Sequence, residues 1–154
     1  MRMLTSAAAL AALITIAPAA RAQGHDGHGG GDSALVDPNT ATQEQLAAVP
    51  GMSAALAGQI VQRRPFQTML PLDSLLGATL SRAQRTELYR HMFIRINLNT
   101  ASRDEIMLIP GVGRRMAHEF EEYRPYSDMA RFRREIGKYV NQAEVARLER
   151  YVRL

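Results

Sequence analysis

The chain has 154 residues, with 19 lysines and arginines against 15 aspartates and glutamates, and a formal net charge of +4. It contains no cysteine, which excludes disulfides and cysteine-based zinc or iron-sulfur sites, so apolar packing must stabilise the fold. A net charge this small argues against long-range electrostatic capture of nucleic acid, but it leaves room for local basic patches.

Residues 1–22 have the pattern of a secretory signal peptide. Arg2 precedes an apolar run over 4–17, and Ala20-Arg21-Ala22 is a small-x-small cleavage signature, which predicts a mature protein starting near Gln23. The apolar run is shorter than the ~20 residues of a transmembrane helix, and an uncleaved anchor is the alternative interpretation. We therefore expect a soluble exported protein, periplasmic or extracellular, with no stable membrane insertion after cleavage.

Residues 23–34 are rich in glycine and histidine, which predicts a flexible linker. His25, Asp26 and His28 lie in this segment, but two histidines on a glycine run give a metal ion no fixed geometry. We expect no metal site and no cofactor.

A repeat with a period of 60 residues occupies the rest of the chain. Residues 35–94 and 95–154 align without a gap and share 13 identical positions, whereas chance gives roughly three or four. The second copy has 12 basic and 9 acidic residues, and the first has 5 and 4. Units of this size are often marginal alone, so we expect the two to pack together or share a core.

Helix starts are well marked in both copies. Capping boxes at Thr42-x-x-Gln45 and Ser102-x-x-Glu105 open a first helix, which Pro-Gly at 50–51 or 110–111 ends. The second helix is expected to bury one face, formed by Leu56, Ala57 and Ile60 or by Met116, Ala117 and Phe120.

Two more helices are expected in each copy. The third is predicted at about 71–76 or 129–136, with Gly77 or Gly137 as its C-terminal cap. The fourth starts at Ser81-x-x-Gln84 or Asn141-x-x-Glu144 and is expected to bury Leu88 and Met92, or Val145, Leu148 and Val152. The link 93–98 is expected to be briefly extended but too short for a sheet. The fold class is therefore all-α, with about four short helices in each copy.

The bend between the first two helices of the second copy has the chemistry of a phosphate site. Gly111 and Gly113 can adopt positive φ or allow close approach of a foreign backbone, and the amides of residues 113–115 open a new helix. Such a helix start attracts anions, and Arg114 and Arg115 add forked donors. The predicted DNA-binding residues of this hairpin are therefore Gly111, Val112, Gly113, Arg114 and Arg115. A tight interhelical turn is the alternative interpretation.

The first copy has Gly51, Met52 and Ser53 at the same place without adjacent cations, and these three residues with Arg64 form a weaker predicted site. Arg64 and Arg124 each precede proline and an aromatic residue, which favours a packing or ion-pair role as much as phosphate binding.

A second basic cluster follows the hairpin of the second copy, and its alternative interpretation is a solvated helix surface. The cluster consists of Arg131, Arg133, Arg134 and Lys138, of which we include Lys138 in the predicted site. Glu119, Glu121 and Glu122 would repel a nucleic-acid backbone, so contact is expected only at the hairpin tip.

The pattern apolar-Pro-Gly-apolar-Gly at 109–113 resembles the helix-hairpin-helix motif of sequence-independent DNA binders. Together with Ile96-Asn97-Leu98-Asn99-Thr100-Ala101-Ser102, it is similar to the opening signature of the ComEA-type competence DNA receptors. The resemblance implies two tandem helix-hairpin-helix units, export, and binding of double-stranded DNA without sequence preference during uptake. It also implies uptake-channel or pilus proteins as partners.

Ser53 in the first hairpin is a feature shared with the extrinsic photosystem subunit PsbU, a secreted protein-binding relative of that fold. This resemblance implies the alternative function, a secreted structural or interaction module without DNA binding. An enzyme is not expected, because Asp128 is better explained as a helix N-cap than as a glycosylase aspartate.

Overall fold

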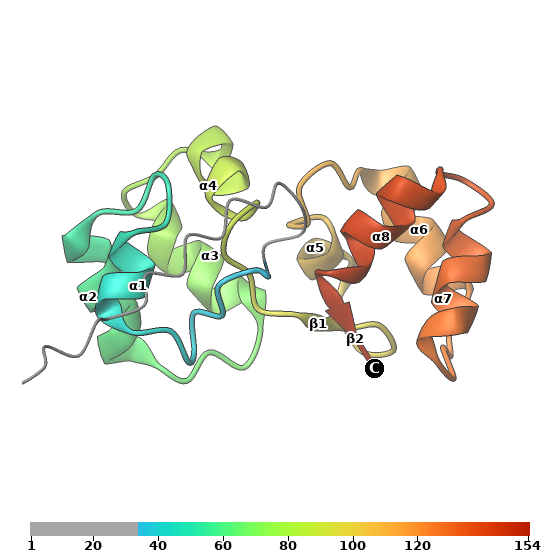
Figure 1. Ribbon diagram of the computed structural model, residues 1–154, viewed down its shortest axis with the longest axis horizontal. Helices are drawn as coiled ribbons and strands as arrows, with labels where there is room; N and C mark the ends of the chain where they lie inside the picture. The colour runs from blue at the N-terminus through green and yellow to red at the C-terminus, as the bar shows by residue number, and fades with distance from the viewer. Residues whose placement is uncertain (1–33) are drawn as a thin grey trace, which may run out of the picture. The chain divides into compact units, whose positions relative to one another are not determined.

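The structure is a computed structural model that describes residues 34–154, so the predicted signal peptide and residues 23–33 of the predicted linker lie outside the described residues. Within residues 34–154 the chain is mostly helical, with eight short helices and one pair of two-residue strands (Figure 1). In chain order these are α1 Gln43–Ala47, α2 Ala54–Arg63, α3 Met69–Gly77, α4 Arg82–Leu88, β1 Ile96–Asn97, α5 Arg103–Ile106, α6 Arg114–Glu122, α7 Met129–Ile136, α8 Gln142–Glu149 and β2 Val152–Arg153. None of the helices in this part of the chain is long and apolar enough to cross a membrane.

The predicted N-caps explain where most helices begin. Thr42, Ser81 and Ser102 form complete capping boxes at α1, α4 and α5, as predicted. Asp128 caps α7 by accepting a hydrogen bond from the Arg131 amide at 2.7 Å. The fourth predicted box is only half formed at α8, because Glu144 turns its carboxylate to an arginine one turn later.

Several helix ends differ from the predictions. Helix α3 begins at Met69, two residues before the predicted start, because Pro71 is tolerated in a first turn where its missing N–H has no partner to lose. Gly137 is the C-cap of α7, as predicted, with a helical φ of −61°. Gly77 is instead the last residue of α3, and Ala78 is its C-cap. Positive φ is confined, among the described glycines, to Gly51 and Gly111.

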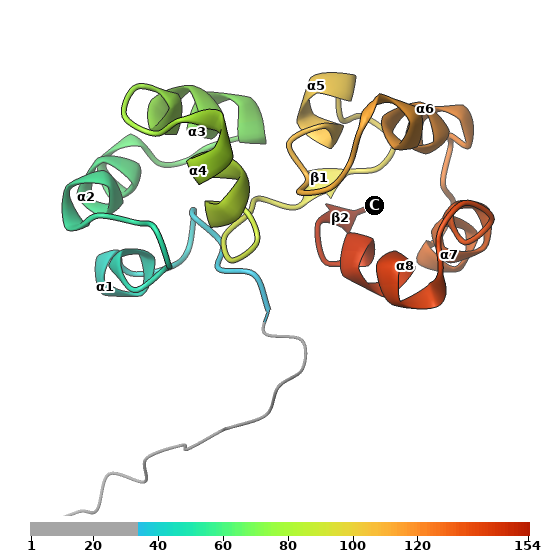
Figure 2. The ribbon, with the colours of Figure 1, turned by 90° about the horizontal axis from the view of Figure 1, so that it is seen from above.

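The last residues of each half are extended rather than helical, which corrects the expected fourth helix. Val152 of β2 pairs in parallel with Ile96 of β1, and Figure 2 shows the two strands side by side. Met92 forms an isolated parallel bridge with Val36. Each pair joins the start of one half to the end of the same half. The two pairs occupy equivalent positions, because Val36 and Met92 each lie 60 residues before Ile96 and Val152. The link is extended as expected, but the expectation that it is too short for a sheet was wrong, because Ile96 and Asn97 form a two-residue ladder with Val152 and Arg153.

The core is one continuous cluster of buried residues that draws on both halves of 34–154. Phe120 of α6 and Phe132 of α7 are fully buried, and their rings meet edge to face with centroids 5.3 Å apart. Burying a side chain of this kind contributes about 1.5–3 kcal/mol. This contact fixes α6 on its inner face and leaves the first turn of α6 directed away from the core.

Candidate nucleic-acid interface

Both hairpins use the same backbone turn. Gly111 has φ +83° and Gly51 has φ +84°, a left-handed conformation that strains any residue with a Cβ atom. The Val112 amide donates to the Ile109 carbonyl at 3.0 Å, and the matching Met52 amide donates at 2.9 Å. The turn therefore depends on Gly111 and on the internal hydrogen bond of the residue that follows it.

Val112 was predicted to be part of the DNA site, and the structure corrects this prediction. Its side chain is 9% exposed and belongs to the core, and its amide is already bonded within the turn. Met52 is half-buried at the matching place. These two residues hold the hairpins rather than face a ligand.

The start of α6 has unused hydrogen-bond donors. Gly113 is the N-cap in an extended conformation, with φ −102°, and has no side chain that could cap the helix. Within residues 34–154 the amides of Arg114, Arg115 and Met116 donate to no acceptor. Such a helix start carries a partial positive charge and binds anions.

The N-cap of α2 differs from that of α6 because it carries a side-chain hydroxyl group. Ser53 is its N-cap, and the Ser53 hydroxyl accepts a hydrogen bond from the Leu56 amide at 3.2 Å. This bond occupies the donor that corresponds to Met116 in the second hairpin. The first hairpin therefore has one open amide fewer than the second at its helix start.

Arg114 and Arg115 are exposed, and neither forms an ion pair or side-chain hydrogen bond within the described part of the chain. Other arginines of the same half are equally exposed but engaged. Arg103 pairs with Glu121, and Arg133 pairs with Glu149, although half of each arginine side chain is open to solvent. The two guanidinium groups at the hairpin are thus available to an external anion.

The acidic residues behind the hairpin are less repulsive than expected. Glu121 forms an ion pair with Arg103, and Glu119 is buried, with 8% of its surface exposed. Glu122 lies 3.2 Å from the His118 ring. Of the three, only Glu122 presents a largely exposed carboxylate, and it lies at the C-terminal end of α6, away from the hairpin.

Lys138 lies close to the hairpin although 25 residues separate it from Gly113. The two residues line a hollow of about 410 Å³ together with Arg115, Met116, Glu119 and Tyr139. The Lys138 ammonium pairs with Glu135 and lies 4.9 Å from the centroid of the Tyr123 ring. The Glu135 carboxylate raises the pKa of Lys138, so this cation is present but already partnered.

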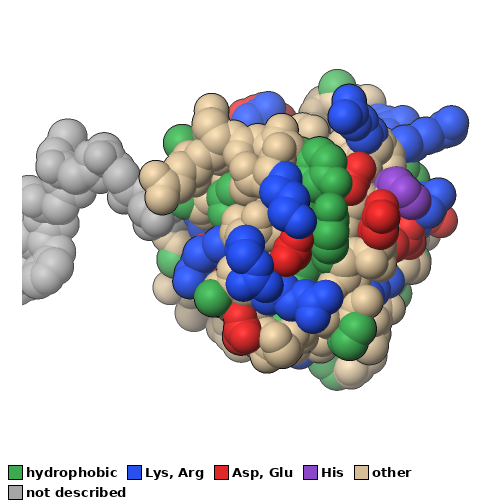
Figure 3. Space-filling model, turned by 90° about the vertical axis from the view of Figure 1, so that its right-hand side faces the viewer, with side chains coloured by type: hydrophobic (Ala, Val, Ile, Leu, Met, Phe, Trp, Pro, Cys, Tyr) green, Lys and Arg blue, Asp and Glu red, His purple; other side chains and the backbone are tan. Residues whose placement is uncertain are grey.

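Basic side chains do not form one continuous surface on this end of the molecule. Figure 3 shows lysine and arginine side chains in separate groups, with a strip of hydrophobic side chains and several acidic ones between them. The arrangement agrees with contact at the hairpin tip rather than along a helix face.

Arg64, the fourth residue of the predicted weaker site, is engaged by the backbone. Its Nε donates to the Pro38 carbonyl and its Nη2 to the Ala41 carbonyl, both at 2.5 Å. Arg124 makes the same two bonds, to Leu98 and Ala101, both at 2.6 Å. The structure therefore favours the packing role for both arginines, which tie the exit of each hairpin to the start of its half.

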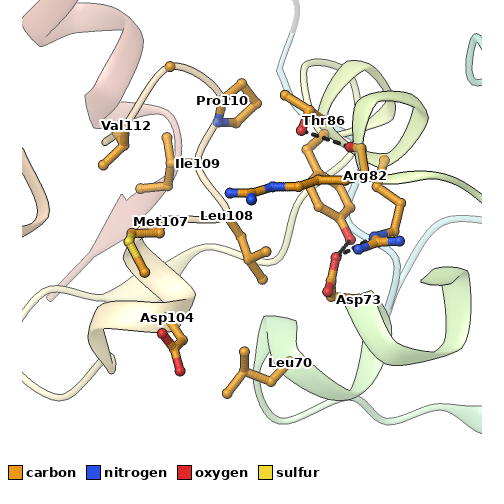
Figure 4. Close-up of a pocket in the computed structure, with 13 residues that line it drawn as sticks. Leu70, Asp73, Arg82, Thr86, Asp104, Met107, Leu108, Ile109, Pro110 and Val112 are labelled. Carbon is orange, nitrogen blue, oxygen red and sulfur yellow. Dashed lines mark hydrogen bonds and ion pairs between the residues drawn. The ribbon is translucent and has the colours of Figure 1, made fainter. Parts of the chain in front are cut away.

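A residue that the sequence did not indicate lies against the second hairpin. Arg82, the first residue of α4, lines a hollow of about 470 Å³ with Thr86 of the same helix and with Pro110 and Gly111 (Figure 4). Pro110 is buried, whereas the matching Pro50 is exposed. No sequence pattern links Arg82 to a hairpin in the other copy, because the neighbourhood arises from tertiary packing.

Comparison with known proteins bears on the first half of the chain. Residues 31–84 match the family model described as a helix-hairpin-helix motif. No curated protein and no solved structure matches the chain. The chain thus carries a helix-hairpin-helix motif, which is consistent with nucleic-acid binding. The matched segment contains the hairpin at Gly51, and the hairpin at Gly111 lies beyond it.

Proposed function

We propose that this protein binds double-stranded DNA without sequence preference, through backbone phosphates held mainly at the second hairpin. The observation that carries the proposal is the open first turn of α6, where unbonded amides lie next to Arg114 and Arg115. Phosphate contacts of this kind position a protein on DNA but do not read bases. The activity is binding, and no enzymatic step is part of the proposal.

We further propose that residues 35–94 and 95–154 are tandem copies of one helix-hairpin-helix unit. Several contacts recur with both partners shifted by 60 positions, which supports the proposal. Asn39 bonds to the backbone of Phe66, as Asn99 does to that of Tyr126. The arginine bonds to carbonyls and the positive φ of Gly51 and Gly111 recur in the same way.

The biological setting follows from the resemblance to ComEA-type proteins and from the pattern of residues 1–22. We propose an exported, periplasmic or extracellular protein that takes part in DNA uptake and passes DNA to channel or pilus proteins. The alternative is a structural or protein-interaction module with the same fold. The Ser53 cap favours that use for the first hairpin, because one of its N-terminal donors, the Leu56 amide, is already bonded.

Titration of labelled duplex DNA at several salt concentrations tests the proposal. Affinity should fall as salt rises, with a slope near 0.9 for each neutralised phosphate. Replacing Arg114 and Arg115 together by alanine should weaken binding by about tenfold or more and reduce the slope by about two. The melting temperature should change little, because both side chains are exposed and unpartnered.

The matched control is the double variant Arg103→Ala with Arg133→Ala, which loses the same charge from the same half. Both of these arginines are committed to carboxylates, so we expect a smaller loss of affinity. Equal weakening in the two double variants would show that overall charge, rather than the hairpin, binds DNA. Absence of binding, or a response independent of salt, would favour the interaction module.

A further inference from the structure

The second hairpin faces a cation from the other half of the described chain. Figure 4 shows the Arg82 side chain extending from α4 toward the backbone of residues 108–110. Arg82 is exposed, and no carboxylate pairs with it among residues 34–154. The Ser81 capping box fixes the start of α4, so the position from which Arg82 extends is defined.

The other arginine of α4 in this hollow has a structural role. Arg85 bonds to the Asp73 carboxylate at 2.8 Å and to the Leu80 carbonyl at 2.8 Å. Asp73 also accepts a hydrogen bond from the Tyr89 hydroxyl, so this carboxylate is already engaged. Of the two arginines that line this hollow, Arg82 is therefore the one whose guanidinium group is available to bind an external anion.

The hairpin contributes Gly111 to the lining of the same hollow. Gly111 is exposed, and its amide makes no hydrogen bond within the described residues. Arg147 Nη2 lies 3.3 Å from the place that a Cβ atom of Gly111 would occupy, although this arginine is paired with Glu144. Asp104, the remaining carboxylate of the hollow, lies at the opposite end from Pro110 (Figure 4).

We infer that Arg82 completes the phosphate-binding site of the second hairpin, so that the first half supplies a ligand to the second. The inference rests on the proposed function and adds one contact to it. The ligand is a phosphodiester of duplex DNA next to the phosphate held at α6. It is bound between the Arg82 guanidinium and the Gly111 amide, a charge-assisted pair of donors. DNA binding then requires the packed arrangement of both halves, even though the first hairpin has its own cap.

Three substitutions of Arg82 test the inference in the full-length protein. Arg82→Ala and Arg82→Gln should each raise the Kd for duplex DNA by about 3–10-fold and reduce the salt slope by about one. Arg82→Lys keeps the charge and should stay within about threefold of the parent. The Arg82 side chain is exposed, so circular dichroism and melting temperature should match those of the parent.

The control is Arg63→Ala, which removes an exposed arginine of the same half that has no ion pair within residues 34–154 and does not line this hollow. If Arg82→Ala behaves like Arg63→Ala while the Arg114 and Arg115 double variant loses affinity, the inference is overturned and the proposed function stands. If none of these variants alters binding, the proposed function fails as well. Weakening by Arg82→Ala without an effect of the double variant would also overturn the inference, because Arg82 would then act away from the hairpin.

Discussion

At the scale of single residues, two buried tyrosines differ in whether their hydroxyl group forms a hydrogen bond. Tyr89 is 1% exposed, and its hydroxyl donates to the Asp73 carboxylate at 2.6 Å. Tyr126 is 2% exposed, and its hydroxyl has no hydrogen-bond partner within the described chain. An unsatisfied buried polar group costs about 1–3 kcal/mol, whereas a bonded one contributes to stability.

Phenylalanine substitutions at these two positions should therefore have effects of opposite sign. Tyr126→Phe removes the unpartnered oxygen and keeps the ring that packs on Phe132. We expect the free energy of unfolding to rise by about 1 kcal/mol, as measured by urea denaturation. Tyr89→Phe should lower it by about 1–2 kcal/mol, because Asp73 loses a donor. A loss of stability in Tyr126→Phe would show that its hydroxyl is bonded in solution.

The same substitution should change the alkaline stability of the protein. Burial raises the pKa of Tyr126 to about 12, compared with about 10 in an unfolded chain. Between these values the unfolded state loses its proton and the folded state keeps it, so stability falls as the pH rises from about 10 to about 12. The advantage of Tyr126→Phe over the parent should therefore grow in this window.

At the scale of elements, local hydrogen-bonding patterns account for the parts of the fold that the sequence predicts. A cap depends on two residues three positions apart, so Thr42, Ser81, Ser102 and Asp128 could be assigned from their neighbours alone. The predicted ends of the fourth helices were less accurate, because Met92 and Val152 instead pair with backbone 56 residues earlier in the chain. The arginine bonds to carbonyls and the approach of Arg82 to the hairpin also depend on tertiary contacts. The candidate site was therefore predicted only where it is local.

The absence of a side-chain cap at α6 lowers stability and, under the proposed function, leaves its first amides open to phosphate. An Asp side chain at position 113 would cap α6 and complement its dipole, and a Cβ atom added at Gly113 meets no atom within 4 Å. Gly113→Asp should raise the free energy of unfolding by about 0.5 kcal/mol. It should also weaken DNA binding by about tenfold, because the carboxylate occupies the amides and repels phosphate.

The control for this prediction is Ser53→Asp, which introduces the same residue at the N-cap of α2, where a side chain already caps the helix. Stability and affinity should both change little there. Urea denaturation and duplex titration measure the two quantities. Unchanged affinity in Gly113→Asp would exclude the α6 amides as phosphate ligands.

At the scale of the whole described unit, Phe93 joins the two halves. Its ring meets Tyr89 edge to face at 5.8 Å and Tyr151 at 5.0 Å, and its amide donates to the Val36 carbonyl at 3.0 Å. Tyr151 comes just before β2, so this ring connects the end of the second half to the end of the first. A shared core of this kind makes unfolding cooperative, because neither half keeps its apolar contacts when the other unfolds.

We therefore expect the protein to unfold in one transition, with equal calorimetric and van 't Hoff enthalpies. Phe93→Ala should lower the free energy of unfolding by about 3–5 kcal/mol and make the van 't Hoff enthalpy the smaller of the two, because the halves become uncoupled. Leu72→Ala, at a fully buried position within the first half, should cost about 2–5 kcal/mol but keep a single transition. Two resolved transitions in the parent protein would contradict the shared core. They would also remove the reason for Arg82 to stay beside the second hairpin, since its place there depends on the packing of both halves.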